Sequence, residues 1–103
     1  MKPVLIISTY PNKKSILEIA NDLVKSKIIA CVNISKIDSV YSWNDTIQNS
    51  AEYIAIFKTV TKNKSKLKKK IAETHPYDVP EIAEIDVTSI NKSYLNWLIE
   101  STN

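Results

Sequence analysis

The residues best suited to chemistry lie in one short stretch, His75-Pro76-Tyr77-Asp78-Val79-Pro80-Glu81. It contains the only histidine of the chain and two of its four prolines. Each proline fixes its own φ at about −65° and disfavours helix at the preceding residue, so the stretch predicts a rigid loop. A rigid loop presents its polar side chains in a fixed geometry, as a binding site requires. The alternative is a structural loop that only connects a helix to a strand.

One candidate site in this stretch is a metal site made of His75, Asp78 and Glu81. A neutral imidazole is a good ligand for copper, zinc or nickel, and the two carboxylates follow it at three-residue steps. One imidazole with carboxylates and water gives weak affinity, so Cu(II) or another divalent metal would be weakly bound and not obligatory. The alternative role for a lone histidine is that of a buried hydrogen-bonding residue.

A second candidate site combines Lys58 with Glu52 and Tyr77. Glu52 and Lys58 point to the same side of one expected strand, and a lysine inside an apolar strand needs an anion nearby. That anion is either Glu52, in a structural ion pair, or a small anionic ligand held by Lys58 and the loop. An acid–base pair of His75 and Glu81 in a hydrolase is a third possibility, but we expect a protein that is not an enzyme.

The composition is that of an ordinary globular domain, with 44% hydrophobic and 24% charged residues among 103. The net charge of +3 is too small to indicate binding to nucleic acid or to an anionic membrane. All 14 basic residues are lysine, and glycine is absent, which excludes arginine forks and glycine-rich phosphate loops. No apolar run reaches the ~18 residues of a membrane span and no signal peptide is recognisable, so we expect a cytoplasmic protein.

Apolar periodicity predicts a single α+β domain over residues 1–103, with the order β-α-β-β-α-β and an extra C-terminal helix. Strands are expected at residues 4–10, 28–43, 47–60 and 82–88. Helices are expected after caps at Asn12, at Thr61 or Asn63, and at Asn91. Right-handed crossovers arrange this order as a ferredoxin-like sandwich, with both main helices on one face of an antiparallel sheet.

Helical spacing and alternation indicate which side chains reach the core. The first helix should end near Lys27, and its buried stripe should consist of Ile16, Ile19, Ala20, Leu23 and Val24. In the last strand Glu84 and Asp86 alternate with apolar neighbours, which predicts that these acids face water while the core receives Ala83, Ile85 and Val87.

The segments 28–43 and 47–60 predict a long hairpin with a tight turn at Asn44-Asp45, because both turn residues tolerate positive φ. At roughly 3.3 Å per residue, each arm would span on the order of 45–50 Å. The radius of gyration expected for a domain of this length is only about 13 Å. The far end of the hairpin should therefore project from the sheet.

The strand segments 5–7 and 53–57 are apolar on both faces, although one chain has only enough helix to cover one face. The second face and the projecting hairpin should therefore be covered by other copies of the chain. The residues expected at these contacts are Tyr41, Trp43, Ile54, Ile56 and Phe57.

Several short motifs are spaced along the chain: Ala30-Cys31-Val32-Asn33, Tyr41-Ser42-Trp43, Glu52, Lys58-Thr59, His75-Pro76-Tyr77, Pro80-Glu81, Tyr94 and Trp97. In this order and spacing they resemble the CutA divalent-ion tolerance family. The resemblance covers essentially the whole chain, and its most specific part is His-Pro-Tyr followed by Pro-Glu.

The resemblance implies a homotrimer of ferredoxin-like subunits, similar in architecture to the PII signalling proteins. It also implies divalent metal binding, copper above all, a role in the response to metal ions, and no established enzymatic activity. Some bacterial members have a cysteine where this chain has Ser8 and a second histidine where it has Thr74, both implicated in copper binding. Only His75 is left of that set. The alternative is a PII-like sensor that binds a small anionic ligand in the cleft between subunits.

Overall fold

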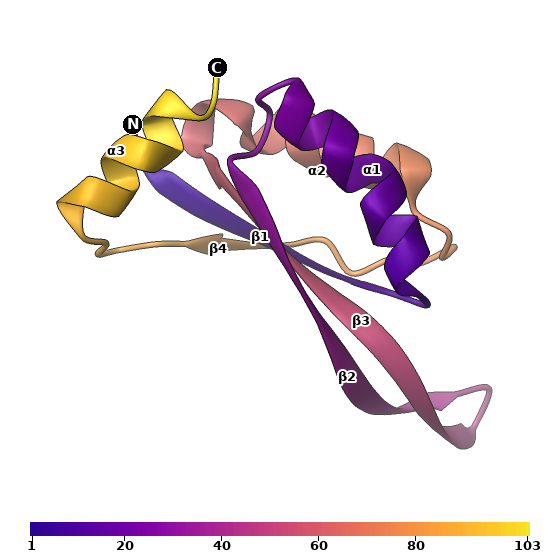
Figure 1. Ribbon diagram of the computed structural model, residues 1–103. Coiled ribbons are helices and arrows are strands. Elements are labelled where there is room, and N and C mark those ends of the chain that lie inside the picture. The colour runs from indigo at the N-terminus through magenta and orange to yellow at the C-terminus, as the bar shows by residue number, and fades with distance from the viewer.

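The chain forms a four-stranded antiparallel sheet with two helices on one face (Figure 1). The computed structural model describes residues 1–103. In chain order the elements are β1 (Pro3–Tyr10), α1 (Lys13–Lys25), β2 (Cys31–Trp43), β3 (Thr46–Val60), η1 (Thr61–Asn63), α2 (Lys64–Thr74), β4 (Ala83–Asp86) and α3 (Lys92–Glu100). The strands pair in the order β2-β3-β1-β4. The predicted ferredoxin-like sandwich with an extra C-terminal helix and a long hairpin is confirmed.

The core lies between the sheet and helices α1 and α2. Ile6 and Phe57 are opposite each other in the β1–β3 ladder, so both side chains lie on the helix-covered face, where both are fully buried. The helices pack onto them with Ile16, Ile19, Leu23, Leu67 and Ile71. The prediction that Phe57 contacts another copy is therefore wrong, because its position in the alternation places it under the helices of its own chain.

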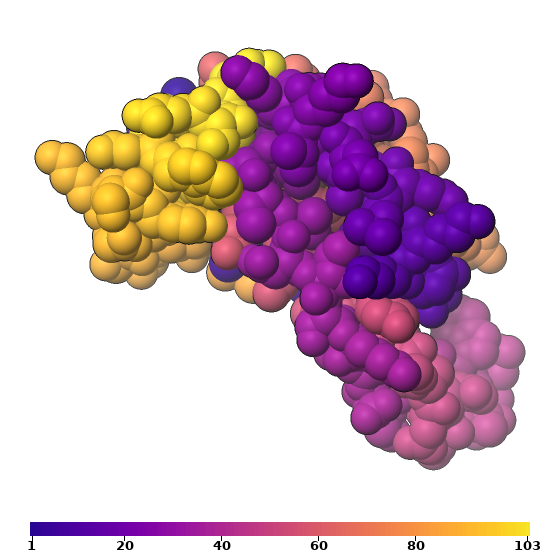
Figure 2. All heavy atoms as spheres, viewed as in Figure 1, coloured from indigo at the N-terminus to yellow at the C-terminus, as the bar shows by residue number.

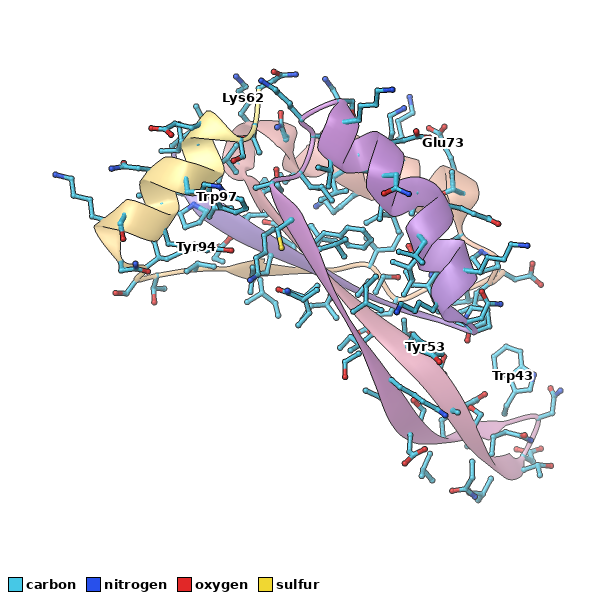
Figure 3. All side chains as sticks on the ribbon, in the orientation of Figure 1. Trp43, Tyr53, Lys62, Glu73, Tyr94 and Trp97 are labelled. Atoms are coloured by element: carbon cyan, nitrogen blue, oxygen red, sulfur yellow. The ribbon has the colours of Figure 1, made fainter.

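The other side of the sheet, which we call the open face, carries a row of incompletely buried apolar side chains. They are Leu5, Ile7, Ile54, Ile56 and Ile85. Helix α3 contacts β3, and Figure 3 shows Tyr94 and Trp97 on the side of α3 that faces the strands. The strands β1 and β3 are thus apolar on both faces, as predicted, and most of the open face has no helix over it.

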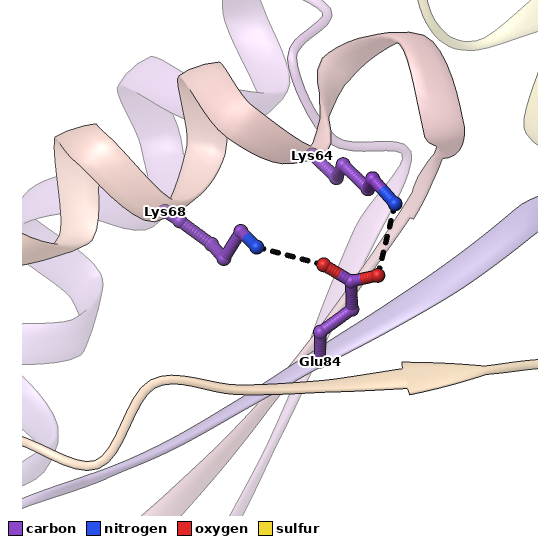
Figure 4. A network of polar contacts seen from close by, with 3 residues as sticks. All are labelled: Lys64, Lys68 and Glu84. Carbon is purple, nitrogen blue, oxygen red and sulfur yellow. Dashed lines mark hydrogen bonds and ion pairs between the residues drawn. The ribbon is translucent and has the colours of Figure 1, made fainter.

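The register of β4 reverses the predicted facing of its side chains. Glu84 pairs with Ile6 and so faces the helices, whereas Ile85 lies on the open face and is 42% exposed. Glu84 is accommodated there because Lys64 and Lys68 of α2 reach its carboxylate, with N–O distances of 2.9 and 2.7 Å (Figure 4). Alternation in the sequence separates the side chains of a strand into two faces. It does not determine which face packs against the helices, because that depends on partners such as Lys64 and Lys68.

The hairpin of β2 and β3 projects from the body of the molecule, as predicted. The strands are 13 and 15 residues long, and the molecule extends 45 Å along its longest axis. The turn residues Asn44 and Asp45 have φ of 52° and 61°, the left-handed values expected of them. Figure 2 shows the tip standing clear of the other elements, where the apolar side chains of Val40 and Ile47 are exposed.

The predicted helix caps lie at the correct positions, but only one of the asparagines works as a cap. Asn12 caps α1, since its Oδ1 accepts a hydrogen bond from the backbone N–H of Ser15 at 2.8 Å. Asn63 precedes α2, yet its side-chain amide donates to the carbonyl of Ile28 instead. Asn91 precedes α3, and its amide donates to the Ser93 hydroxyl.

Three predicted boundaries and one core position need correction. Helix α1 ends at Lys25, and the chain reverses with a positive φ of 62° at Lys27. Val24 is therefore on the last turn and is 45% exposed, not buried. The strand β2 begins at Cys31 and not at residue 28, while β4 covers only Ala83–Asp86 of the predicted 82–88, and each of its residues pairs with one of β1.

Candidate functional site

His75 follows α2 directly and turns its imidazole into the protein. Its Nε2 lies 3.0 Å from Ser8 Oγ, and its Nδ1 accepts a hydrogen bond from the Tyr77 backbone N–H at 3.1 Å. The ring stacks on that of Tyr10, with 4.2 Å between ring centroids. Because Nδ1 is an acceptor, the proton of the neutral ring sits on Nε2, which donates to Ser8. Both ring nitrogens are thus used inside the chain.

These contacts favour the structural role of His75 over metal ligation. A metal ion needs a nitrogen lone pair, and the one on Nδ1 is already occupied by the Tyr77 N–H. Burial lowers the pKa of His75, against a smaller opposing effect of the Thr9 backbone, so the ring is neutral at pH 7. Ser8 is fully buried, so the Ser8–His75 pair cannot meet a substrate, and no hydrogen bond joins His75 to Glu81.

The loop after His75 places Tyr77 against Glu52 of β3. The Tyr77 hydroxyl donates to Glu52 Oε2 at 2.7 Å, and no other hydrogen bond within the chain reaches this carboxylate. Burial, together with the neighbouring Glu52 carboxylate, raises the pKa of Tyr77 above its usual value. A connected series of contacts therefore runs from buried Ser8 through His75 and Tyr77 to Glu52.

An open cleft of about 490 Å³ lies between this loop and the hairpin. We call it the hairpin cleft, and its lining residues are Thr9, Tyr41, Trp43, Gln48, Glu52, Tyr77, Asp78, Val79 and Glu81. Three carboxylates and three aromatic rings line it, yet none of the 14 lysines of the chain does. Figure 3 shows Trp43 near the end of the hairpin, with its indole standing off the strand toward the body of the molecule.

The predicted metal set is not brought together within one chain. Asp78 and Glu81 line the hairpin cleft, whereas His75 turns away from it toward Ser8 and Tyr10. No three His, Cys, Asp or Glu side chains gather closely enough to hold a metal ion. Spacing along a loop does not determine the direction in which each side chain points. The sequence therefore could not show that His75 points away from Asp78 and Glu81. Asp78 and Glu81 instead share the hairpin cleft with Glu52.

Lys58 lies outside the hairpin cleft. Its Nζ is 3.4 Å from the Tyr94 hydroxyl and 5.4 Å from the centroid of the Tyr94 ring. Glu52 is six residues away on the same strand, roughly 20 Å at the usual rise, so the predicted ion pair does not form. Of the predicted ligand set, only Glu52 and Tyr77 share a pocket within one chain.

Ser8 and Tyr10 support the loop through their contacts with His75, and neither is among the predicted site residues. Ser8 occupies a core-facing position of an apolar strand, and a buried hydroxyl of this kind needs a hydrogen-bond partner, which is the signal that could have found it. Tyr10 has no hydrogen-bond partner for its buried hydroxyl. Burial raises the pKa of Tyr10 to about 12, and the nearby Ser8 hydroxyl opposes this slightly.

Comparison with known protein families gives a match over nearly the whole chain. The family model described as CutA1 divalent ion tolerance protein matches residues 4–101. The chain belongs to the CutA1 family. The predicted resemblance is therefore confirmed.

Two CutA relatives match along nearly their full length as well. The divalent-cation tolerance protein CutA of Pyrococcus horikoshii is 39% identical over 99 residues, which cover 96% of this chain and 97% of the relative. That of Thermotoga maritima is 38% identical over 98 residues, covering 95% and 97%. The crystal structure of the divalent ion tolerance protein CutA1 from Ehrlichia chaffeensis superposes with a TM-score of 0.94 at 39% identity, covering 100% of this chain and 98% of that one.

Proposed function

We propose that this protein is a homotrimeric divalent-cation tolerance protein that binds divalent ions weakly through the carboxylates of the hairpin cleft. Membership of the CutA1 family supports the tolerance role. The binding site rests on one observation, that Glu52, Asp78 and Glu81 line a cleft without any lysine. Negative charge without a counter-charge attracts cations, and carboxylate oxygens coordinate hard divalent ions. The proposal includes no obligatory cofactor and no catalysis.

Copper would lack its preferred nitrogen ligand at this site. Copper(II) prefers imidazole nitrogen, and the only imidazole of the chain, His75, uses both of its nitrogens internally. Copper should therefore bind only weakly, through carboxylate oxygens and without a nitrogen ligand.

The homotrimer is supported by the open face and the hairpin. Leu5, Ile7, Ile54 and Ile56 form a continuous apolar row that this chain leaves incompletely buried. At the hairpin, Tyr41 is 43% exposed and Trp43 is 58% exposed. A contiguous apolar surface of this kind on a small domain favours association with further copies.

Calorimetric titration with Mg²⁺, Zn²⁺ and Cu²⁺ tests the proposed metal site. Combining Asp78→Asn with Glu81→Gln should weaken binding of all three ions, because it removes two of the cleft's carboxylates. Glu100→Gln, at an exposed acid on α3, is the matched control and should leave binding unchanged. Metal binding that is lost with His75→Gln but retained in the cleft variant would contradict the proposal.

The rival proposal, a PII-like sensor of a small anion, has less support. It needs a positive charge in the binding cleft, and the lysine assigned to it, Lys58, contacts Tyr94 instead. Tight binding of an anionic metabolite in a thermal-shift screen, abolished by Lys58→Met, would revive it.

We propose the cytoplasm as the compartment, on the basis of the composition. No helix of the chain is long and apolar enough to cross a membrane. Relatives differ, since an Archaeoglobus fulgidus structure is named as a periplasmic CutA and an Arabidopsis thaliana protein as chloroplastic. Cell fractionation with antibody detection of the native protein tests this.

A further inference from the structure

We infer that the Glu52 carboxylate of one copy pairs with the Lys58 ammonium of the next copy at each interface of the trimer. The ion pair that the sequence predicts within the chain thus forms between chains. The inference rests on the proposed homotrimer and adds to it the charged contact that orients the copies. It leaves Asp78 and Glu81 free for the proposed divalent ions.

The charged residues of the strands are the first argument. Side chains directly opposite each other in an antiparallel pair share a face, so the three ladders assign each charged strand residue to one face. Four of them fall on the same face as Phe57, namely Lys36, Asp38, Glu84 and Asp86. The strands carry only two others, Glu52 and Lys58. The open face therefore receives one acid and one base from the whole sheet.

The surroundings of Lys58 are the second argument. Leu5 and Cys31 are its neighbours across the two ladders, and its Nζ lies 3.4 Å from the Tyr94 hydroxyl, which carries no charge. No ion pair within the chain includes Lys58, although its side chain is only partly exposed. Another copy that covers the open face buries this ammonium, and a buried charge is strongly unfavourable without a counter-charge. The covering copy therefore has to supply a carboxylate.

The position of Glu52 is the third argument. Its Oε2 accepts the Tyr77 hydroxyl at 2.7 Å, and no lysine of the same chain reaches it. The Tyr77 backbone N–H is in turn held by His75 Nδ1 at 3.1 Å, so the carboxylate has a fixed position. An ammonium group supplies both the counter-charge and the donor that its other oxygen lacks within the chain.

The symmetry of a closed ring is the fourth argument. Glu52 and Lys58 lie at opposite ends of an apolar row, Ile54 and Ile56, roughly 20 Å apart at the usual rise of a strand. Copies in a closed ring of three meet through two different surface patches, so the Lys58 end of one copy can contact the Glu52 end of the next. Apolar side chains then meet in the middle, and opposite charges meet at every interface.

Reversing the two charges tests this contact on the assembled protein. Glu52→Lys and Lys58→Glu each place like charges at every interface, so each should abolish the trimer in sedimentation equilibrium at micromolar concentration. The double variant exchanges the charges and should restore the trimer, because opposite charges meet again. Glu18→Lys and Lys69→Glu make the same changes at exposed positions on α1 and α2 and should leave the trimer intact.

Neutral variants test the contact if a reversed variant does not fold. Lys58→Met and Glu52→Gln each leave one charge unpaired and should lower the melting temperature, whereas the combined variant should melt above either single variant. Effects of sites more than about 7–10 Å apart usually add, so non-additive melting temperatures report a contact between copies. Tyr94→Phe, the control for the other contact of Lys58, should lower the melting temperature less than Lys58→Met.

The outcomes separate this inference from the proposed function. A wild-type monomer removes the homotrimer and the inference together. A wild-type trimer whose assembly survives both single reversals removes the inference alone. If the double reversal does not restore the trimer, the neutral variants decide: additive melting temperatures exclude the pair, and non-additive ones support it.

Discussion

His75 connects the buried core to the polar loop. Its ring is fixed on both sides, by Ser8 at Nε2 and by the Tyr77 N–H at Nδ1, and it stacks on Tyr10. Through Tyr77 this arrangement fixes the Glu52 carboxylate at the cleft. A single neutral imidazole thus sets the position of two side chains that line the hairpin cleft.

Acidification should destabilise the protein through His75. The pKa of His75 is lowered in the folded state by burial, so the unfolded chain takes up the proton first as the pH falls. Stability is therefore fully present above the unfolded pKa of about 6.5 and is lost as the pH falls toward the lowered folded pKa. Melting temperatures measured from pH 7.5 to pH 5.5 should fall more steeply for wild type than for His75→Gln. Equal slopes would show that another group titrates.

The elements of this chain are joined without glycine, which leaves local strain at the reversals. Lys27 after α1 has a φ of 62°, a left-handed value that costs a residue with a Cβ roughly 1–2 kcal/mol. Asn44 and Asp45 also have positive φ, but their short polar side chains tolerate it better. Of these three residues, Lys27 is therefore the one whose replacement should increase stability most.

Lys27→Gly should stabilise the protein. Glycine adopts the left-handed conformation without the Cβ penalty and is the usual residue after a helix end. A gain of about 1 kcal/mol corresponds to a rise in melting temperature of about 4–8 °C for a domain of this size. Glu18→Gly, in the exposed interior of α1, is the control and should lower the melting temperature instead. A decrease for Lys27→Gly would contradict the strain argument.

Helix α2 is attached to β4 by the carboxylate of Glu84 between Lys64 and Lys68. Hydrogen bonds from Lys68 and then Lys64 lower the pKa of Glu84. The ionised Glu84 carboxylate stabilises the fold through these two contacts. This stability is present above the ordinary pKa of 4.5 and is lost as the pH falls through the lowered pKa of the folded state. The free energy of unfolding measured in urea should therefore be lower for Glu84→Gln than for wild type at pH 7. This difference in free energy should become smaller toward pH 3. If the two proteins differ in unfolding free energy by the same amount at both pH values, the substitution acts through packing and not through charge.

At the scale of the whole molecule, the two faces of the sheet differ in how far they are covered by the chain itself. Phe57 and its neighbours are sealed by α1 and α2, whereas Ile54 and Ile56 stay on the open face beside a projecting hairpin. The first face stabilises the chain itself, and the second is available for other copies. Changes on the two faces should therefore have different consequences.

Sedimentation equilibrium should give about three times the 11.7 kDa mass of the chain. Ile56→Asp should prevent this assembly, because burying an unpaired carboxylate between copies costs several kcal/mol. Phe57→Ala should act differently, lowering stability by about 3–5 kcal/mol through a core cavity. Leu17→Asp, at a partly exposed position on α1, is the control and should leave the trimer intact. A wild-type monomer would contradict the proposed assembly.

Local chemistry in the sequence determined the element order, the Asn44-Asp45 turn, the cap at Asn12 and the two-faced character of β3, because each depends on neighbours within a few residues. The exchange of faces in β4 and the inward turn of His75 were decided only by the tertiary structure. Each depends on contacts distant in sequence, such as Glu84 with Lys68 or His75 with Ser8. Spacing along the chain limits which residues can share a face, but burial and hydrogen-bond partners decide which face is inside.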